Sequence, residues 1–265
     1  RSLGAMIRQT NPTSVYVVFD GAGSTANRKN LLSEYKSKRN LQRITNWDAF
    51  DSLEEEHDSK IDQIVRVIQY LKLLPVKTTL IDKVEADDII AVLSKKLVNK
   101  FNSTCFIVSS DKDFLQLVTD KIIVYRPIEK EYYTPKTVKE KYGVIPENFI
   151  LYKTLLGDNS DNIPGVKGLG VKGIFKKFPE LQYKMLSLGD IFDISARKFK
   201  EHVVYSRVVQ DQDRIETSFK VMDLGTPMIS VKEDVYLDEL IKEDIPELNI
   251  DMFVQFYNSD QLGGM

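Results

Sequence analysis

The fold is first indicated by an apolar run that ends in an aspartate, VYVVFD at residues 15–20. Val, Ile, Thr and aromatic residues are enriched in strands, and short apolar runs rich in them are typical of buried strands. Three more runs of this kind occur at residues 78–81, 105–109 and 122–125. We therefore expect strands at these four places.

Helical patterns separate the expected strands. One lies around residues 60–74 and another at about 86–99, where Ile89, Leu93 and Leu97 recur on one face. Alternation of strands and helices predicts an α/β fold with a parallel sheet. From about residue 135 onward the pattern becomes mostly helical.

Acidic side chains crowd at three further places, VEADDII at residues 84–90, SSDKDF at 109–114 and LGDNSDN at 156–162. Ligands gather at the carboxyl ends of parallel strands, which is where Asp20 and Asp111 fall. Carboxylates crowded at one edge repel each other unless a cation lies between them, and hard divalent ions prefer oxygen ligands. The pattern predicts a metal-dependent site for phosphoryl transfer.

Each acidic cluster alone also fits a simpler role. The first could cap a helix, the second could form a turn, and the third could be an ordinary loop. The first two clusters and Asp20 coincide at one expected edge of the sheet, and this coincidence favours the metal site.

Composition excludes several classes of protein. The chain has 265 residues, of which 42% are hydrophobic, enough to bury a core in one large or two small domains. It has no apolar run of about 18 residues that would predict a membrane span, and its N-terminus lacks the apolar stretch of a secretory signal. One cysteine excludes an internal disulfide and a cysteine zinc site, which favours a reducing compartment.

A glycine-rich segment follows the last acidic cluster, NIPGVKGLGVKG at residues 162–173. Its spacing is typical of a helix-hairpin-helix turn, whose glycines let backbone N–H groups approach a phosphate closely. Lys172 and Lys176 follow on the next helix, whose N-terminal dipole favours the same phosphate. Such contacts grip the backbone without reading sequence. The alternative is a glycine-rich loop before a surface helix.

Basic residues cluster between Arg28 and Arg43, with Tyr35 among them. Basic groups can funnel a single strand of nucleic acid, and an aromatic ring can stack on an unpaired base. Beside a carboxylate–metal site, cations such as Lys36 and Arg39 would stabilise the charge that develops on the scissile phosphate. On its own, the run would be expected to form a solvated surface.

Together these motifs resemble the 5′-nuclease, or flap endonuclease, superfamily, in the form of the bacteriophage enzymes and the 5′-nuclease domain of bacterial DNA polymerase I. The motifs, in matching order, are FDG at 19–21, RK at 28–29, YKSKR at 35–39, EADD at 85–88, SSDKD at 109–113 and GDNSDNIPGVKGLG at 157–170. The resemblance implies a PIN-like, mostly parallel α/β sheet flanked by helices, a helical arch, and a helix-three-turn-helix DNA-binding module. The family begins with a strand that carries a further aspartate, and nothing before Asp20 matches that strand.

The resemblance also implies a division of the chain. Residues 1–134 would form the nuclease core, without the family's first strand and with the arch at about 28–60. Residues 135–220 would form the helix-hairpin-helix module, and residues 221–265 would pack on the core. As part of an arch, residues 35–39 are expected to be poorly ordered without DNA.

Residue by residue, the resemblance implies three sets. The metal shell would comprise Asp20, Glu85, Asp87, Asp88, Asp111, Asp113, Asp158 and Asp161. The catalytic cations would be Lys36 and Arg39. Contacts to DNA would come from Arg28, Lys29, Tyr35, Gly165, Val166, Gly168, Gly170, Lys172 and Lys176.

The implied activity is hydrolysis of phosphodiester bonds in 5′-flap, branched or 5′-ended DNA, in replication and repair. Two Mg²⁺ ions, for which Mn²⁺ can substitute, would activate a water and stabilise the leaving oxygen. K⁺ would bind the hairpin carbonyls. The expected partners are DNA and an RNA–DNA hybrid, with no membrane, and the expected form is a monomer in the cytoplasm of a bacterial or phage-infected cell.

Two other functions remain open at this point. A haloacid-dehalogenase-type phosphatase also uses an Asp-x-Asp motif, but its later loop reads GDxxxD, whereas this chain has GDNSD at residues 157–161. Such a phosphatase also has no use for a helix-hairpin-helix. The second alternative is a non-catalytic module that binds DNA structures, which the unmatched first strand favours.

Overall fold

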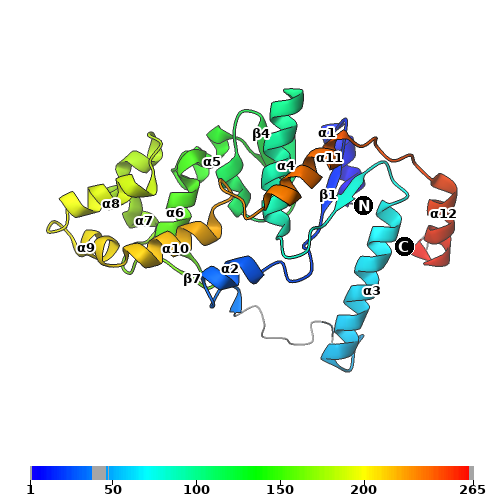
Figure 1. Cartoon of the computed structure of the whole chain (residues 1–265), viewed down its shortest axis with the longest axis horizontal. Helices are drawn as coiled ribbons and strands as arrows, with labels where there is room; N and C mark the ends of the chain where they lie inside the picture. The colour runs from blue at the N-terminus through cyan, green and yellow to red at the C-terminus, as the bar shows by residue number, and fades with distance from the viewer. Residues whose placement is uncertain (1, 38–45, 47, 263–265) are drawn as a thin grey trace.

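The computed structural model describes residues 2–37, 46 and 48–262, and its ribbon is shown in Figure 1. The elements in chain order are α1 (Ser2–Thr10), β1 (Tyr16–Val18), α2 (Ala26–Leu31), α3 (Leu53–Leu71), β2 (Lys77–Thr79), α4 (Ala86–Phe101), β3 (Cys105–Val108), η2 (Asp113–Leu117), β4 (Ile122–Arg126), β5 (Glu131–Tyr133), α5 (Pro135–Tyr142), η3 (Pro146–Asn148), α6 (Phe149–Leu156), β6 (Gly157–Asp158), β7 (Ile163–Pro164), α7 (Val171–Lys177), η4 (Pro179–Gln182), α8 (Leu188–Arg197), α9 (Val203–Gln210), α10 (Gln212–Met222), α11 (Val231–Lys242) and α12 (Ile250–Ser259).

Local sequence signals set the ends of several helices. At the start of α5 the Thr134 hydroxyl accepts a hydrogen bond from the Thr137 N–H, and Pro135 occupies the first turn, where no backbone donor is needed. The same helix ends at Gly143, whose φ of 71° is the left-handed conformation that glycine adopts without strain. Helices α8 and α11 each begin with a capping box, at Ser187 and Ser230.

The expected strands and helices are present, but the parallel strands form two sheets. Strands β1 and β2 pair in parallel, with Val17 opposite Thr78. Strands β3 and β4 also pair in parallel, and β5 adds to β4 in the antiparallel direction. In the described part of the chain no ladder joins these two sheets, so the expected mostly parallel pairing is present but divided between them. Helix α4 contacts both sheets and holds them in one body.

Two apolar clusters stabilise this arrangement. The larger one runs from the β3–β4 sheet through α6 to the helices α7 to α10. The smaller one joins the α4 face of Ile89 and Leu93 to Leu237, Leu240 and Ile241 of α11. The predicted periodic face of α4 is therefore the surface on which α11 packs.

The last helix, α12, contacts α3 instead of the sheets. The guanidinium of Arg66 in α3 donates to both carboxylate oxygens of Asp260 at 2.7 Å, and the Tyr70 hydroxyl donates to the same carboxylate at 2.8 Å. Tyr70 also packs edge-on against Phe253 and Phe256 of α12. Figure 1 shows α3 and α12 at one end of the molecule and α8, α9 and α10 at the other. None of the described helices combines the length and apolar content that crossing a bilayer requires.

Gly21 brings the end of β1 against the loop after β2. A Cβ atom at this position would lie 1.8 Å from the carbonyl oxygen of Ile81, which real structures do not tolerate. The Gly21 N–H also donates to the Val84 carbonyl at 3.3 Å, and the Lys83 N–H donates to the Ala22 carbonyl at 2.8 Å. This close approach of the two backbones places Asp20 beside the start of α4.

We expect Gly21→Ala to destabilise the protein by about 2 kcal/mol or more, because the obstructing atoms are backbone and the two strands must separate. The midpoint of urea unfolding measures the change. Gly189→Ala is the matched control, since its new methyl group would meet the Ser187 hydroxyl at an ordinary 3.6 Å. Equal stability of the two variants would show that the close approach at Gly21 is not needed.

Candidate active site

Three carboxylates from distant parts of the sequence converge. Asp113 begins η2, Asp158 ends β6, and Asp161 lies in the turn before β7. Each offers one oxygen, and these oxygens all lie within 4.8 Å of one another. The structure thus brings the 109–114 cluster to the 156–162 cluster, as the sequence led us to expect. Carboxylate oxygens at this spacing form a donor set that suits hard divalent cations.

The two acidic loops are held by hydrogen bonds to their own backbone. The Asp111 N–H donates to the Ser109 hydroxyl at 3.1 Å, and the Asp113 N–H donates to the Asp111 carboxylate at 2.8 Å. In the other loop, the Ser160 N–H donates to the Asp158 carboxylate at 2.8 Å. These turns orient Asp113 and Asp158 before any ion binds.

Lys153 was missed by sequence reasoning, although it lies among the carboxylates. Its ammonium contacts the Asp113 carboxylate and lies 2.8 Å from an oxygen of Asp158. Burial disfavours the charged form of Asp158, yet Lys153 and the Ser160 hydrogen bonds hold the pKa of this carboxyl well below its usual range. The available signal was a single lysine within the apolar helix α6, FILYKTLL.

Two residues of the EADD motif at the start of α4, Glu85 and Asp88, pair with a buried arginine. Arg28 is 3% exposed and donates to both oxygens of Asp88, at 2.6 and 3.0 Å, and its Nη1 lies 2.8 Å from Glu85. The Met228 N–H donates to Asp88 as well, at 3.0 Å. Asp88 therefore accepts three hydrogen bonds from protein donors, a structural role that the sequence did not indicate, and its expected place in the metal shell stays a prediction. Arg28 is buried, so in this conformation it does not offer the contact with DNA that was expected of it.

Tyr35 and Lys36 both bind Glu85. The Tyr35 hydroxyl donates to it at 3.1 Å and the Lys36 ammonium at 2.8 Å, while the Lys36 N–H donates to the Asp161 carbonyl at 2.9 Å. Tyr35 is 3% exposed, so it cannot stack on a base in this conformation. The expected disorder of these two residues without DNA stays a prediction, and in this conformation both are held by these bonds. Arg39 lies outside the described residues, as do the rest of residues 38–45 and residue 47 of the expected arch.

Asp87 is a buried carboxyl with the carboxylate of Asp111 nearby. Burial and the nearby carboxylate of Asp111 raise the pKa of Asp87 to about 7. A divalent ion between these groups would relieve that repulsion, so the residues present fit such an ion. Asp20 has a different contact: it is exposed and accepts a hydrogen bond from the Ala86 N–H at 2.8 Å, which is the bond of a helix cap.

The glycine-rich hairpin lies directly after the carboxylates, between α6 and α7. Gly168 has a φ of +82°, and a Cβ there would lie 2.8 Å from the guanidinium of Arg207. Arg207 donates to the Lys167 carbonyl at 2.7 Å, and Arg214 donates to the Pro164 carbonyl at 2.9 Å. Both arginines come from the α9–α10 region and were not singled out from the sequence.

The other expected DNA-contacting residues differ in their exposure. Lys172 and Lys176 are exposed on α7, and Lys29 is half-buried on α2. The Val166 side chain is 2% exposed and its N–H donates to the Leu155 carbonyl at 2.8 Å. In this conformation Val166 therefore does not offer the contact with DNA that was expected of it. A Cβ atom at Gly165 would lie 2.2 Å from the carbonyl oxygen of Leu156. A glycine is therefore needed here for the backbone of the hairpin to pack against the end of α6. Gly170 has open space around it.

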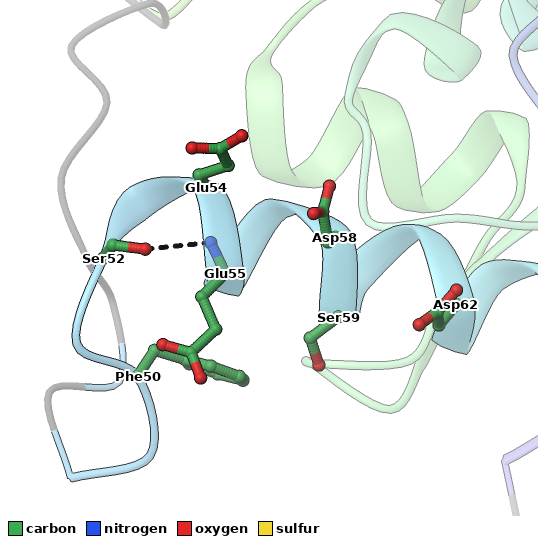
Figure 2. Close-up of a pocket in the computed structure, with 7 residues that line it drawn as sticks. All are labelled: Phe50, Ser52, Glu54, Glu55, Asp58, Ser59 and Asp62. Carbon is green, nitrogen blue, oxygen red and sulfur yellow. Dashed lines mark hydrogen bonds between the residues drawn. The ribbon is translucent and has the colours of Figure 1, made fainter.

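Two cavities among the described residues lie apart from the carboxylates. Figure 2 shows one of about 550 Å³ at the start of α3, where Glu54, Glu55, Asp58 and Asp62 gather and Ser52 caps the helix. Another, of about 530 Å³, is lined by α2, α8 and α10. The carboxylate group lies directly beside the start of the hairpin, since Asp158 and Asp161 immediately precede it in the chain.

In the metal-free protein we expect stability to rise as the pH falls from 7 to 5. Folded Asp87 binds a proton with a pKa of about 7, compared with 3.8 for an unperturbed aspartate, so the folded state binds more protons in this window. The expected gain is about 1 kcal/mol per pH unit. Unfolding in urea with EDTA, at several pH values, measures it. Asp87→Asn should flatten the profile, and an unchanged slope in this variant would contradict the assignment.

Comparison with known proteins places these features in one family. Residues 1–143 match the family model described as "5'-3' exonuclease, N-terminal resolvase-like domain". The 5'-3' exonuclease of Aquifex aeolicus is 31% identical over 94% of this chain and 76% of its own length. DNA polymerase I of Bacillus subtilis is 34% identical over 74% of this chain, which spans 21% of that protein.

Solved structures show the same fold. A structure of T5 5'-exonuclease with bound zinc has a TM-score of 0.74 at 22% identity and covers 93% of this chain and 89% of its own. The bacteriophage T5 flap endonuclease in a complex with DNA and metal ions has a TM-score of 0.69 at 21% identity, over 97% of this chain and 89% of its own. The expected α/β 5′-nuclease fold is therefore confirmed, and by the family model and its relatives this chain belongs to the 5'-3' exonuclease family.

Proposed function

We propose that this chain is a metal-dependent 5′-nuclease that hydrolyses phosphodiester bonds in DNA with a 5′ flap or a 5′ end. The observation that carries the proposal is the convergence of Asp113, Asp158 and Asp161, directly joined to a hairpin of the kind that binds phosphates. Proteins of this family carry the name 5'-3' exonuclease, and a neighbour in fold is a flap endonuclease with DNA and metal ions.

Arg28 neutralises Glu85 and Asp88 of the EADD motif. Five other carboxylates would hold the ions. These are Asp87, Asp111, Asp113, Asp158 and Asp161. Divalent ions bound there would supply Lewis-acid stabilisation of the scissile phosphate and lower the pKa of a water. We propose Mg²⁺ as the ion, two per site, with Mn²⁺ as a substitute.

The cations of the chain itself have separate roles in this proposal. The Lys36 ammonium, held by Glu85 beside the carboxylates, can turn to a phosphate oxygen and stabilise the charge that develops there. Lys172 and Lys176 on α7, together with the adjoining hairpin, would bind the duplex backbone. Held in this way, the duplex would present one phosphodiester bond to the carboxylates.

Finer features belong to the same proposal. We propose that the protein acts as a monomer in the cytoplasm, on DNA and on RNA–DNA hybrids, during replication and repair. A monovalent ion such as K⁺ at the hairpin would have to share the carbonyl oxygens of Pro164 and Lys167, which Arg214 and Arg207 already bind.

The direct test is cleavage of a labelled 5′-flap duplex with and without Mg²⁺. We expect Asp113→Asn to lower turnover by about 100-fold or more while the affinity for flap DNA in Ca²⁺ changes little, since metal ligands act mainly in the transition state. Asp193→Asn, on the exposed side of α8, is the matched control and should keep full activity. Tight binding of the flap with no cleavage in Mg²⁺ or Mn²⁺ would instead identify a non-catalytic DNA-binding module.

The hairpin has its own test, the affinity for a blunt duplex measured by fluorescence anisotropy. We expect Gly168→Val to weaken binding about tenfold or more, because the valine must adopt a left-handed φ and displace Arg207 from the Lys167 carbonyl. Gly170→Val should weaken it less, because its φ of −122° is normal for any residue and no atom obstructs the new side chain. Equal losses in both variants would show that the hairpin conformation is not what holds the duplex.

A further inference from the structure

A buried arginine outside the carboxylate group contacts the loop that carries two of its members. Arg126 is the last residue of β4 and is 6% exposed. Its Nη2 donates to the backbone carbonyl of Ser110 at 2.7 Å. Ser110 directly precedes Asp111, and Asp113 follows two residues later.

The other bonds that shape this loop come from β4, from the loop itself and from Lys153, which contacts the Asp113 carboxylate. The Ser109 N–H continues the β3–β4 ladder by donating to the Tyr125 carbonyl at 3.1 Å. Beyond Ser109, the chain turns through the hydrogen bonds of Asp111 and Asp113 to side chains within the loop itself. Arg126 adds an anchor from a neighbouring strand at the point where the chain leaves the sheet.

Arg126 is itself held on its other side. Its Nη1 lies 2.7 Å from a carboxylate oxygen of Glu129, and its guanidinium lies 5.6 Å from the ring centre of Tyr133. Its buried Nε–H has no partner among the described residues. A buried donor without a partner is unfavourable. The contacts of Arg126 with Ser110 and Glu129 therefore determine how its side chain is oriented.

We propose that Arg126 is a positioning residue for the divalent ions. By fixing the Ser110 carbonyl, it sets the direction in which the following turn presents the carboxylates of Asp111 and Asp113. Outer contacts of this kind orient metal ligands and change metal affinity by about 10- to 100-fold. This inference rests on the proposed function, because it assumes that these carboxylates bind divalent ions.

The test uses the whole chain, without DNA, and measures the dissociation constant of Mn²⁺ by electron paramagnetic resonance of the free ion. We expect Arg126→Met to raise this constant about tenfold or more. Arg126→Lys keeps the charge but loses the planar fork, so its constant should fall between those of Arg126→Met and the wild type. Glu129→Gln is the matched control, since it weakens the ion pair on the other side of Arg126 and leaves the Ser110 contact in place.

A second readout needs no metal. Amide hydrogen exchange of residues 110–113 in EDTA should be faster in Arg126→Met than in wild type, while exchange in α8 stays the same. If Arg126→Met does not fold, Arg126→Lys decides on both measurements.

Three outcomes would overturn the proposal. The first is wild-type Mn²⁺ affinity in the folded Arg126 variants, and the second is an equal loss of affinity in Glu129→Gln, which would assign the effect to general destabilisation. The third is a wild-type protein that binds no Mn²⁺, which would remove the metal site and the proposed function with it. Failure of the Arg126 proposal alone is distinct, because the wild-type protein would then still bind Mn²⁺ and cleave flap DNA.

Discussion

The buried guanidinium of Arg28 is the interaction on which the rest of the site depends. It joins three helices, since it extends from α2, binds Asp88 and Glu85 at the start of α4, and donates to the Val221 carbonyl of α10 at 2.8 Å. A buried charge is tolerated only when it is paired and fully hydrogen-bonded. Removal of Arg28 would leave two buried carboxylates without their main partner, so this cluster is stable only as a unit.

The pairing by Arg28 decides which carboxylates remain for an ion. The Asp88 carboxylate accepts hydrogen bonds from Arg28 and from the Met228 N–H. The pKa of Asp87, one residue earlier, is raised by burial first and then by the nearby carboxylate of Asp111. Lys153 compensates part of the same charge between Asp113 and Asp158. The protein thus pairs the start of α4 with Arg28, and places Lys153 among the carboxylates that we propose as metal ligands.

The sequence predicted the kinds of element and the clusters but not the part each side chain plays. Periodicity located the strands and α4, because burial on one face leaves a repeating signal. Spacing located the three acidic motifs. The burial of Arg28 could not be predicted, because it depends on Val221, which is 193 positions away. Tyr35 was misjudged for the same reason, since an aromatic residue among lysines gives no sign that its hydroxyl reaches a buried Glu85.

Helix α10 connects the two halves of the proposed mechanism. Near its start, Arg214 holds the Pro164 carbonyl of the hairpin, and near its end the Val221 and Met222 carbonyls accept from Arg28 and from Gln116 of η2. Seven residues of α-helix separate Arg214 from Val221, a rise of about 10 Å along the axis. A helix is stiff over such a length, so the hairpin and the carboxylates cannot move independently. In the proposed function this fixed spacing sets the distance between the phosphates that are gripped and the bond that is cleaved, because binding energy at the hairpin then selects one phosphodiester bond.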